Sequence, residues 1–169
     1  MDALISLVGR HNKVFMRNRM LVFFSMLSVI IVITLYAIFL QKTQIDAIEQ
    51  VIPVTTAIKV MVNEWMIAGL LSIIAVTTTL GVFGIYVKDL ETKTTADFLT
   101  TAVSRFKIQL SYVFSALVIG FGISLLAFIC CEFYLIAMGG EVLSLTAILK
   151  IIGILFLSVV LSSVINLFL

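Results

Sequence analysis

Hydrophobic residues occur along this chain in long blocks rather than at short alternating periods. Residues 21–40 contain no charged residue, and residues 66–87 form a second block of the same kind. Two further blocks cover 108–138 and 151–169. A helix of about 20 apolar residues spans the ~30 Å hydrocarbon core of a bilayer and satisfies its own backbone polar groups. The pattern predicts an all-α integral membrane protein, a helical bundle with about four transmembrane helices.

Composition supports the same class. Apolar residues make up 62% of the 169 residues and charged residues only 12%, and the mean hydropathy is +1.26. A soluble domain is about half apolar and about a quarter charged. This chain has too few charges to cover a water-exposed surface, so we expect one transmembrane domain over 1–169. The net charge of +2 gives no reason to expect a nucleic-acid partner.

Basic residues are distributed unevenly between the ends of the predicted spans. Most of the 11 lie in two segments, 1–20 and 88–107. The remaining basic residues are Lys42, Lys59 and Lys150. Because cytoplasmic loops are enriched in Lys and Arg, we expect a multi-pass protein of the plasma membrane with its N-terminus and the 88–107 loop in the cytoplasm.

The segment before the first span separates into two faces on a helical wheel. The apolar face carries Leu4, Leu7, Val8, His11 and Phe15, and the basic face carries Arg10, Lys13 and Arg17. Such a distribution predicts an N-terminal interfacial amphipathic helix over 1–20, whose cations would contact anionic lipid headgroups. The alternative is a basic tail that only sets the orientation.

The loop between the second and third spans reads KDLETKTTADFLTTAVSRFK. Thr94 and Asp97 resemble a capping box, which would start a helix there. The apolar residues that follow would form one stripe of this helix, namely Phe98, Leu99, Ala102, Val103 and Phe106. A helix lying on the membrane surface could transmit force from a soluble partner, although many inner loops are amphipathic without such a role.

The order of these features resembles the membrane (permease) subunit of a type-2 ATP-binding-cassette exporter. The most specific stretch is 97–112, with DFL, SRFK and LSY in succession. The resemblance implies that 88–107 is a coupling helix docking into a separate ATP-binding-cassette ATPase. The docking residues would be Asp89, Leu90, Glu91, Asp97, Phe98 and Arg105. A long outer loop between the first and second predicted spans is part of the same order of features. The resemblance also implies a second permease half or a homodimer as partner.

Two features depart from the family pattern. Many members carry a proline in the coupling segment, whereas the only proline here is Pro53. We therefore expect a less interrupted helix in 88–107. Family members also usually have six spans, and this chain has four, which suggests a fragment or a split subunit.

No motif indicates chemistry within the chain. The phosphate-binding GxxxxGK[ST] loop does not occur, nor does a catalytic or metal-binding spacing. We therefore expect no enzyme activity and no cofactor bound by this chain, with ATP on the partner subunit. The expected function is that of a permease subunit driven by a separate ATPase. The alternatives are a stand-alone small four-helix transporter, an accessory membrane protein and, less well supported, an intramembrane enzyme.

Two features inside the predicted spans suggest specific contacts. Glu132 is the only carboxylate within them. It is a candidate substrate or ion contact at the outer mouth, or a side chain that reaches the interface. Ala116, Gly120 and Ser124 recur every fourth residue, which favours close helix packing along one seam.

Overall fold

The computed structural model describes residues 2–50, 53, 55–101, 103–137 and 143–168. Over these ranges the chain is helical and contains no strand. The helices long and apolar enough to cross a membrane are Arg19–Glu49, Thr56–Glu91, Arg105–Ala137 and Leu145–Leu167. The prediction of an all-α bundle with four such helices is confirmed. Met138, the last residue of the predicted third span, lies outside the described residues.

The first two long helices extend further than the hydropathy blocks. α2 (Arg19–Leu35) continues through a π-helical turn, η1 (Tyr36–Leu40), into α3 (Gln41–Glu49). α4 (Thr56–Glu91) begins well before residue 66. The expected long outer loop is therefore wrong. Hydropathy marks where a helix is apolar, and good helix formers such as Gln, Lys, Ala and Glu carry α3 onward as a polar helix.

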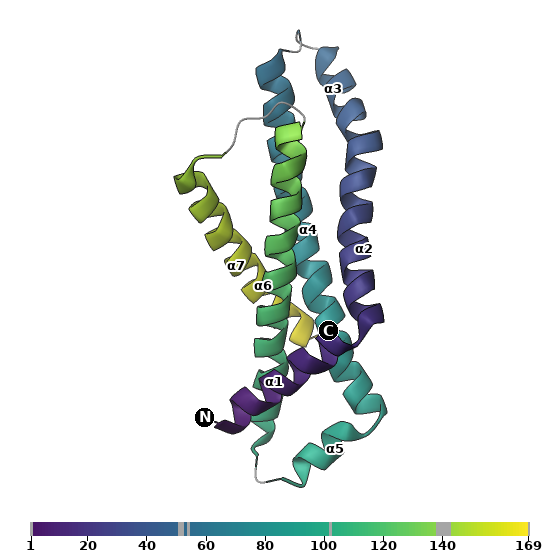
Figure 1. The fold of residues 1–169 in the computed structure, drawn as a ribbon, viewed down its shortest axis with the longest axis vertical. Helices are drawn as coiled ribbons and strands as arrows, with labels where there is room; N and C mark the ends of the chain where they lie inside the picture. Colours follow the sequence, from purple (N-terminus) through teal and green to yellow (C-terminus); the bar gives the residue numbers. More distant parts are fainter. Residues whose placement is uncertain (1, 51–52, 54, 102, 138–142, 169) are drawn as a thin grey trace.

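An N-terminal helix, α1 (Asp2–Arg17), precedes the first long helix. Figure 1 shows it lying across the lower ends of α6 and α4 and leading into α2. The chain turns at Asn18, whose side-chain oxygen accepts a hydrogen bond from the backbone N–H of Leu21 and so caps α2. Phe15 is almost fully buried against the bundle, whereas Arg17 is exposed.

A short helix, α5 (Thr94–Leu99), joins α4 to α6 (Arg105–Ala137) and projects below the bundle in Figure 1. The chain reverses at Lys93, whose φ of 57° lies in the left-handed region. Lys93 occupies the capping position and gives α5 no side-chain capping hydrogen bond. The helix starts where the sequence predicted, but the capping box of Thr94 and Asp97 is wrong.

The same helix ends earlier than expected. The hydroxyl of Thr100 donates to the carbonyl of Asp97 at 2.7 Å, and that of Thr101 donates to the carbonyl of Phe98 at 2.6 Å. These bonds satisfy carbonyls that a continuing helix would use. The expected less interrupted helix and its single stripe are therefore wrong: Phe106 belongs to α6 and is 69% exposed. Ala102, another member of that stripe, lies outside the described residues.

The core forms where α4, α6 and α7 (Leu145–Leu167) approach closely. Ala116, Gly120 and Ser124 all lie on the buried face of α6. A Cβ atom on Gly120 would stand 2.7 Å from Cγ2 of Thr79, so only glycine fits this contact without a shift of its neighbours.

Helix α7 contacts the other helices unevenly. At its C-terminal end the amide of Asn166 donates to Oγ1 of Thr79 on α4 at 2.9 Å. Toward its N-terminal end α7 leans away from α6 (Figure 1). The divergence opens a wedge between α4, α6 and α7 at the end of the bundle opposite α1.

Candidate functional site

An ion pair at the α1 end of the bundle connects α1, α4 and α6. Arg10 of α1 donates two hydrogen bonds to the Asp89 carboxylate of α4, at 2.9 and 3.4 Å. The hydroxyl of Tyr112 on α6 donates to the same carboxylate at 2.7 Å. The hydrogen bonds to Asp89 raise the pKa of Arg10 above its ordinary value, so the guanidinium stays charged.

The same guanidinium reaches the short helix. Its central carbon lies 4.9 Å from the centre of the Phe98 ring on α5. A cation over an aromatic face is attracted by the ring quadrupole. Arg10 thus contacts α4 and α5 directly, and the placement of α5 is linked to that of α1.

His11 anchors the neighbouring turn of α1. Its ring is fully buried and stacks on Tyr112, with ring centres 4.0 Å apart. Arg10 can only donate, so Nδ1 of His11 accepts from it at 3.2 Å and the ring proton sits on Nε2. That N–H donates to Oγ of Ser111 at 3.0 Å, and Ser111 donates to the carbonyl of Ile108 at 2.6 Å.

The environment of His11 favours the neutral ring. Burial, and then the neighbouring charge of Arg10, lower the pKa of His11 to about 4. Near neutral pH the imidazole is therefore uncharged and holds α1 against α6 by hydrogen bonds and stacking.

The predicted docking residues do not share one surface. Those that are exposed are Leu90, Glu91, Asp97 and Arg105. Phe98 is half-buried beneath Arg10. Asp89 is only 7% exposed and is occupied by Arg10 and Tyr112, so its assignment to a docking surface is wrong. A carboxylate just beyond an apolar span is drawn inward here because the half-buried guanidinium of Arg10 and the Tyr112 phenol compensate it.

Arg10 also differs from the expectation. The helical-wheel pattern of residues 1–20 predicted that Arg10 lies on the basic face, toward lipid headgroups. In the structure its side chain is 34% exposed and turns to Asp89. Sequence reasoning missed this pair because the two residues are 79 positions apart. A basic segment and an acidic residue predicted at the same end of the bundle were the available signal.

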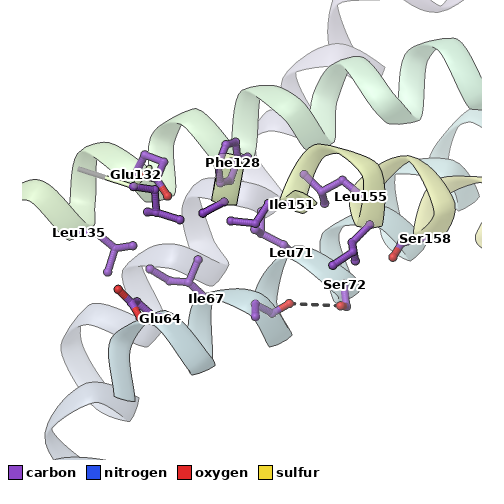
Figure 2. A pocket seen from close by; sticks show the side chains of 14 residues that line it. Glu64, Ile67, Leu71, Ser72, Phe128, Glu132, Leu135, Ile151, Leu155 and Ser158 are labelled. Atoms are coloured by element: carbon purple, nitrogen blue, oxygen red, sulfur yellow. Dashed lines mark hydrogen bonds between the residues drawn. The ribbon is translucent and has the colours of Figure 1, made fainter. Parts of the chain in front are cut away.

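A cavity of about 440 Å³ occupies the wedge at the opposite end of the bundle. Its walls are mostly apolar and come from α4 (Ile67, Leu71), α6 (Phe128, Leu135) and α7 (Ile151, Leu155). Figure 2 shows Glu64 and Glu132 at one end of this lining, and Ser72 and Ser158 at the other.

The two carboxylates have no cationic partner among the residues that the structure describes. Glu64 lies on α4 and is exposed; Glu132 lies on α6 and is half-buried. Neither forms a hydrogen bond or an ion pair with any residue that the structure describes. Glu132 was a candidate contact from sequence alone. Glu64 was missed because it precedes the second hydropathy block, and only the three-dimensional arrangement brings it to Glu132.

A second polar cluster joins the helices at this end. The hydroxyl of Tyr36, in the π-helical turn, donates to Oδ1 of Asn63 at 2.6 Å, and Gln41 donates to the same atom at 3.2 Å. Tyr134 on α6 donates to Gln41 at 3.0 Å. No pattern in the sequence predicted this network. These side chains bond to one another, so the network fixes the long helix formed by α2, η1 and α3 to α4 and α6.

The structure is a helical bundle with four helices long and apolar enough to cross a membrane. One end carries the helix α1, fixed by the Arg10–Asp89 pair. Near the other end is a mostly apolar cavity that also has two carboxylates in its lining, Glu64 and Glu132. In the described ranges no group of three or more His, Cys, Asp or Glu residues could hold a metal ion. No protein-family model, curated protein or solved structure matches the chain.

Proposed function

We propose that this chain is a membrane (permease) subunit of an ATP-driven exporter of the ATP-binding-cassette type. In this proposal the long helices cross the cell membrane, and α1 and α5 lie on the cytoplasmic side. The observation that supports it best is the position of α5, which projects beyond the bundle between two long helices (Figure 1). A projecting helix tied to two spans suits the transfer of movement from a soluble ATPase to the membrane.

The contacts of α5 suggest how that movement would travel. Phe98 packs under Arg10, and Arg10 is paired with Asp89. A displacement of α5 would therefore act on α1 and on the end of α4 together. A short helix linked to rigid elements transmits displacement better than a flexible loop.

The surface offered to the ATPase would consist of the exposed residues of this segment, Leu90, Glu91, Asp97 and Arg105. The exposed basic residues of α1, Lys13 and Arg17, would lie at the anionic headgroups, as in an interfacial amphipathic helix. A second permease half or a second copy of this chain would complete the transport pathway.

The main rival is a stand-alone, proton-coupled exporter of four helices. Such a protein needs a carboxylate that can be reached from both sides of the membrane. Glu132 lies near the C-terminal end of α6 and Glu64 near the N-terminal end of α4, both at the same end of the bundle. This one-sided placement favours the ATPase-driven subunit.

Site-specific photocrosslinking in cells tests the proposal. A photoreactive amino acid at the exposed position Asp97 should capture a protein that contains a phosphate-binding loop and hydrolyses ATP when purified with this chain. The same group at Asp46, exposed at the far end on α3, is the matched control and should not capture it. Transport by this chain alone in proteoliposomes, driven by a proton gradient without an ATPase, would establish the rival instead.

A further inference from the structure

We propose that the cavity between α4, α6 and α7 binds a lipophilic organic monocation. The proposal concerns binding by this chain and does not depend on coupling to an ATPase. It rests on the shape and lining of the cavity, and on the two carboxylates at its end.

The walls select for an apolar guest. A volume of about 440 Å³ lies within the usual range of small-molecule sites, about 300 to 1,000 Å³. Ile67 and Leu71 of α4, Ile151 and Leu155 of α7 and Phe128 of α6 line the wedge together (Figure 2). A guest with aromatic or branched aliphatic groups would remove this apolar surface, and its own, from contact with water or lipid headgroups.

The end of the cavity selects for positive charge. Glu64 and Glu132 both lie there, so two acidic side chains line the same end of the cavity. No cationic side chain in the described ranges pairs with either of them. A monocation held near the two carboxylates would compensate negative charge, and the compensation would be worth most at Glu132, which is half-buried.

An inorganic cation fits the cavity less well than an organic one. Hard cations such as Ca²⁺ and Mg²⁺ need about six or more oxygen ligands, part of which can be water. The hydroxyls in the lining, those of Ser72 and Ser158, lie at the end of the cavity away from the carboxylates. The hydroxyl of Ser72 already donates to the carbonyl of Ala68 at 3.2 Å. A delocalised organic cation carries its apolar body with it and needs no such ligand shell.

Equilibrium binding to the purified chain tests the proposal. The probe is radiolabelled tetraphenylphosphonium, with the chain in nanodiscs of zwitterionic phosphatidylcholine and empty nanodiscs as background. We expect saturable binding. Tetraphenylborate, which has nearly the same shape and the opposite charge, is measured separately and should show none above background. Equal saturable binding of both ions would overturn the proposal.

Two kinds of variant locate the site. Glu132→Gln and Glu64→Gln should each weaken binding of the cation about tenfold or more, whereas Glu49→Gln, on α3 and outside the cavity lining, should leave it unchanged. Ala147→Trp should abolish binding by filling the cavity without altering its charge. Leu149→Trp, on the exposed face of the same helix, is its control.

The outcomes separate cleanly. Unchanged binding in Ala147→Trp, or in a variant that combines Glu64→Gln with Glu132→Gln, would show that the probe binds elsewhere and would end the proposal. If the Gln variants fail to fold, the Trp pair decides. None of these results bears on whether α5 docks an ATPase, so this proposal and the proposed function can fail independently.

Discussion

The guanidinium of Arg10 and the carboxylate of Asp89 lie 2.9 Å apart, although 79 positions separate them in the chain. This pair fixes the N-terminal helix to the end of α4, and Tyr112 completes the hydrogen bonding of the carboxylate. Removing one partner of a poorly solvated ion pair leaves the other charge uncompensated. The docking of α1 should therefore depend on Arg10 far more than on the other basic residues of that helix.

Arg10→Gln should loosen α1. We expect a loss of about 1 to 3 kcal/mol in its docking, less than for a fully buried pair because solvent reaches part of the side chain. Hydrogen–deuterium exchange in nanodiscs would show faster exchange of the α1 amides and unchanged exchange in α7. Lys13→Gln, an exposed neighbour on the same helix, is the control. Equal effects of the two substitutions would contradict the role given to the pair.

Acid should weaken the same docking through His11. In the docked state its pKa is about 4, below the ordinary value of about 6.5. Between these values the undocked helix binds more protons than the docked one, so docking is strongest above pH ~6.5 and weakens as the pH falls toward ~4. The full effect is about 3 kcal/mol at most.

NMR can follow this titration directly, because His11 is the single histidine of the chain. Ring-labelled protein should show the neutral ring with its proton on Nε2 near pH 7, and a midpoint near 4. The variant His11→Gln should lose the pH dependence of α1 exchange between pH ~6.5 and ~4. A midpoint at the ordinary value would mean that the ring is solvated.

Glycine at position 120 should be required for tight packing. In Gly120→Ala the new methyl group would meet Cγ2 of Thr79 at 2.7 Å. Thr79 cannot easily rotate away, since its hydroxyl is bonded to the carbonyls of Ala75 and Val76. We expect a destabilisation of about 1 to 3 kcal/mol from overpacking. It would appear as a lower midpoint of unfolding in dodecyl sulfate.

Gly122→Ala is the matched control for this substitution. It lies on the same helix, and its Cβ would meet no described atom within 4 Å. The effect should be neutral or stabilising by up to about 1 kcal/mol, because Ala is the better helix former. Identical losses at both positions would point to backbone effects rather than to the contact with Thr79.

The contact between Asn166 and Thr79 should hold the end of α7. Asn166→Leu removes a hydrogen bond of 2.9 Å in a buried position. Hydrogen bonds between membrane helices contribute about 0.6 to 2 kcal/mol. A double-mutant cycle with Thr79→Val should give a coupling energy in that range. Additive effects would show that the two side chains act independently.

The proposed orientation predicts a labelling pattern. In a chain whose Cys130 and Cys131 are replaced by Ala, single cysteines at Ser6 and Asp97 should react only with membrane-permeant thiol reagents added from outside. A cysteine at Asp46 should react with impermeant reagents. All three positions are exposed, so accessibility differs only through the membrane. External labelling at Asp97 would reverse the orientation.

Hydropathy was sufficient to predict the four long helices, because apolar block length and helix rise together determine which segments can cross a bilayer. It could not give their ends. Residues 41–49 are polar and still helical, and α5 ends at Leu99 although its apolar spacing continues. Local hydrogen bonds from Thr100 and Thr101 decide that end, and spacing alone does not encode them.

The candidate sites were predictable only in part. Glu132 was identified because an isolated carboxylate in an apolar block is costly. Its neighbour Glu64, and the pairing of Arg10 with Asp89, depend on how the helices are arranged. Such contacts between distant positions follow from packing, which a single sequence does not specify.

The uneven attachment of α7 has a mechanical consequence. Asn166 holds one end of the helix to α4, while its other end, near Leu145, leans away from α6 (Figure 1). The helix is therefore a lever with its pivot at Asn166. A rotation of about 10° about that pivot would displace the far end by about 5 Å, given a rise of 1.5 Å per residue. Small changes in helix angle thus become large changes in the width of the wedge, while Val159, close to the pivot and buried beside Gly120, moves much less than the far end.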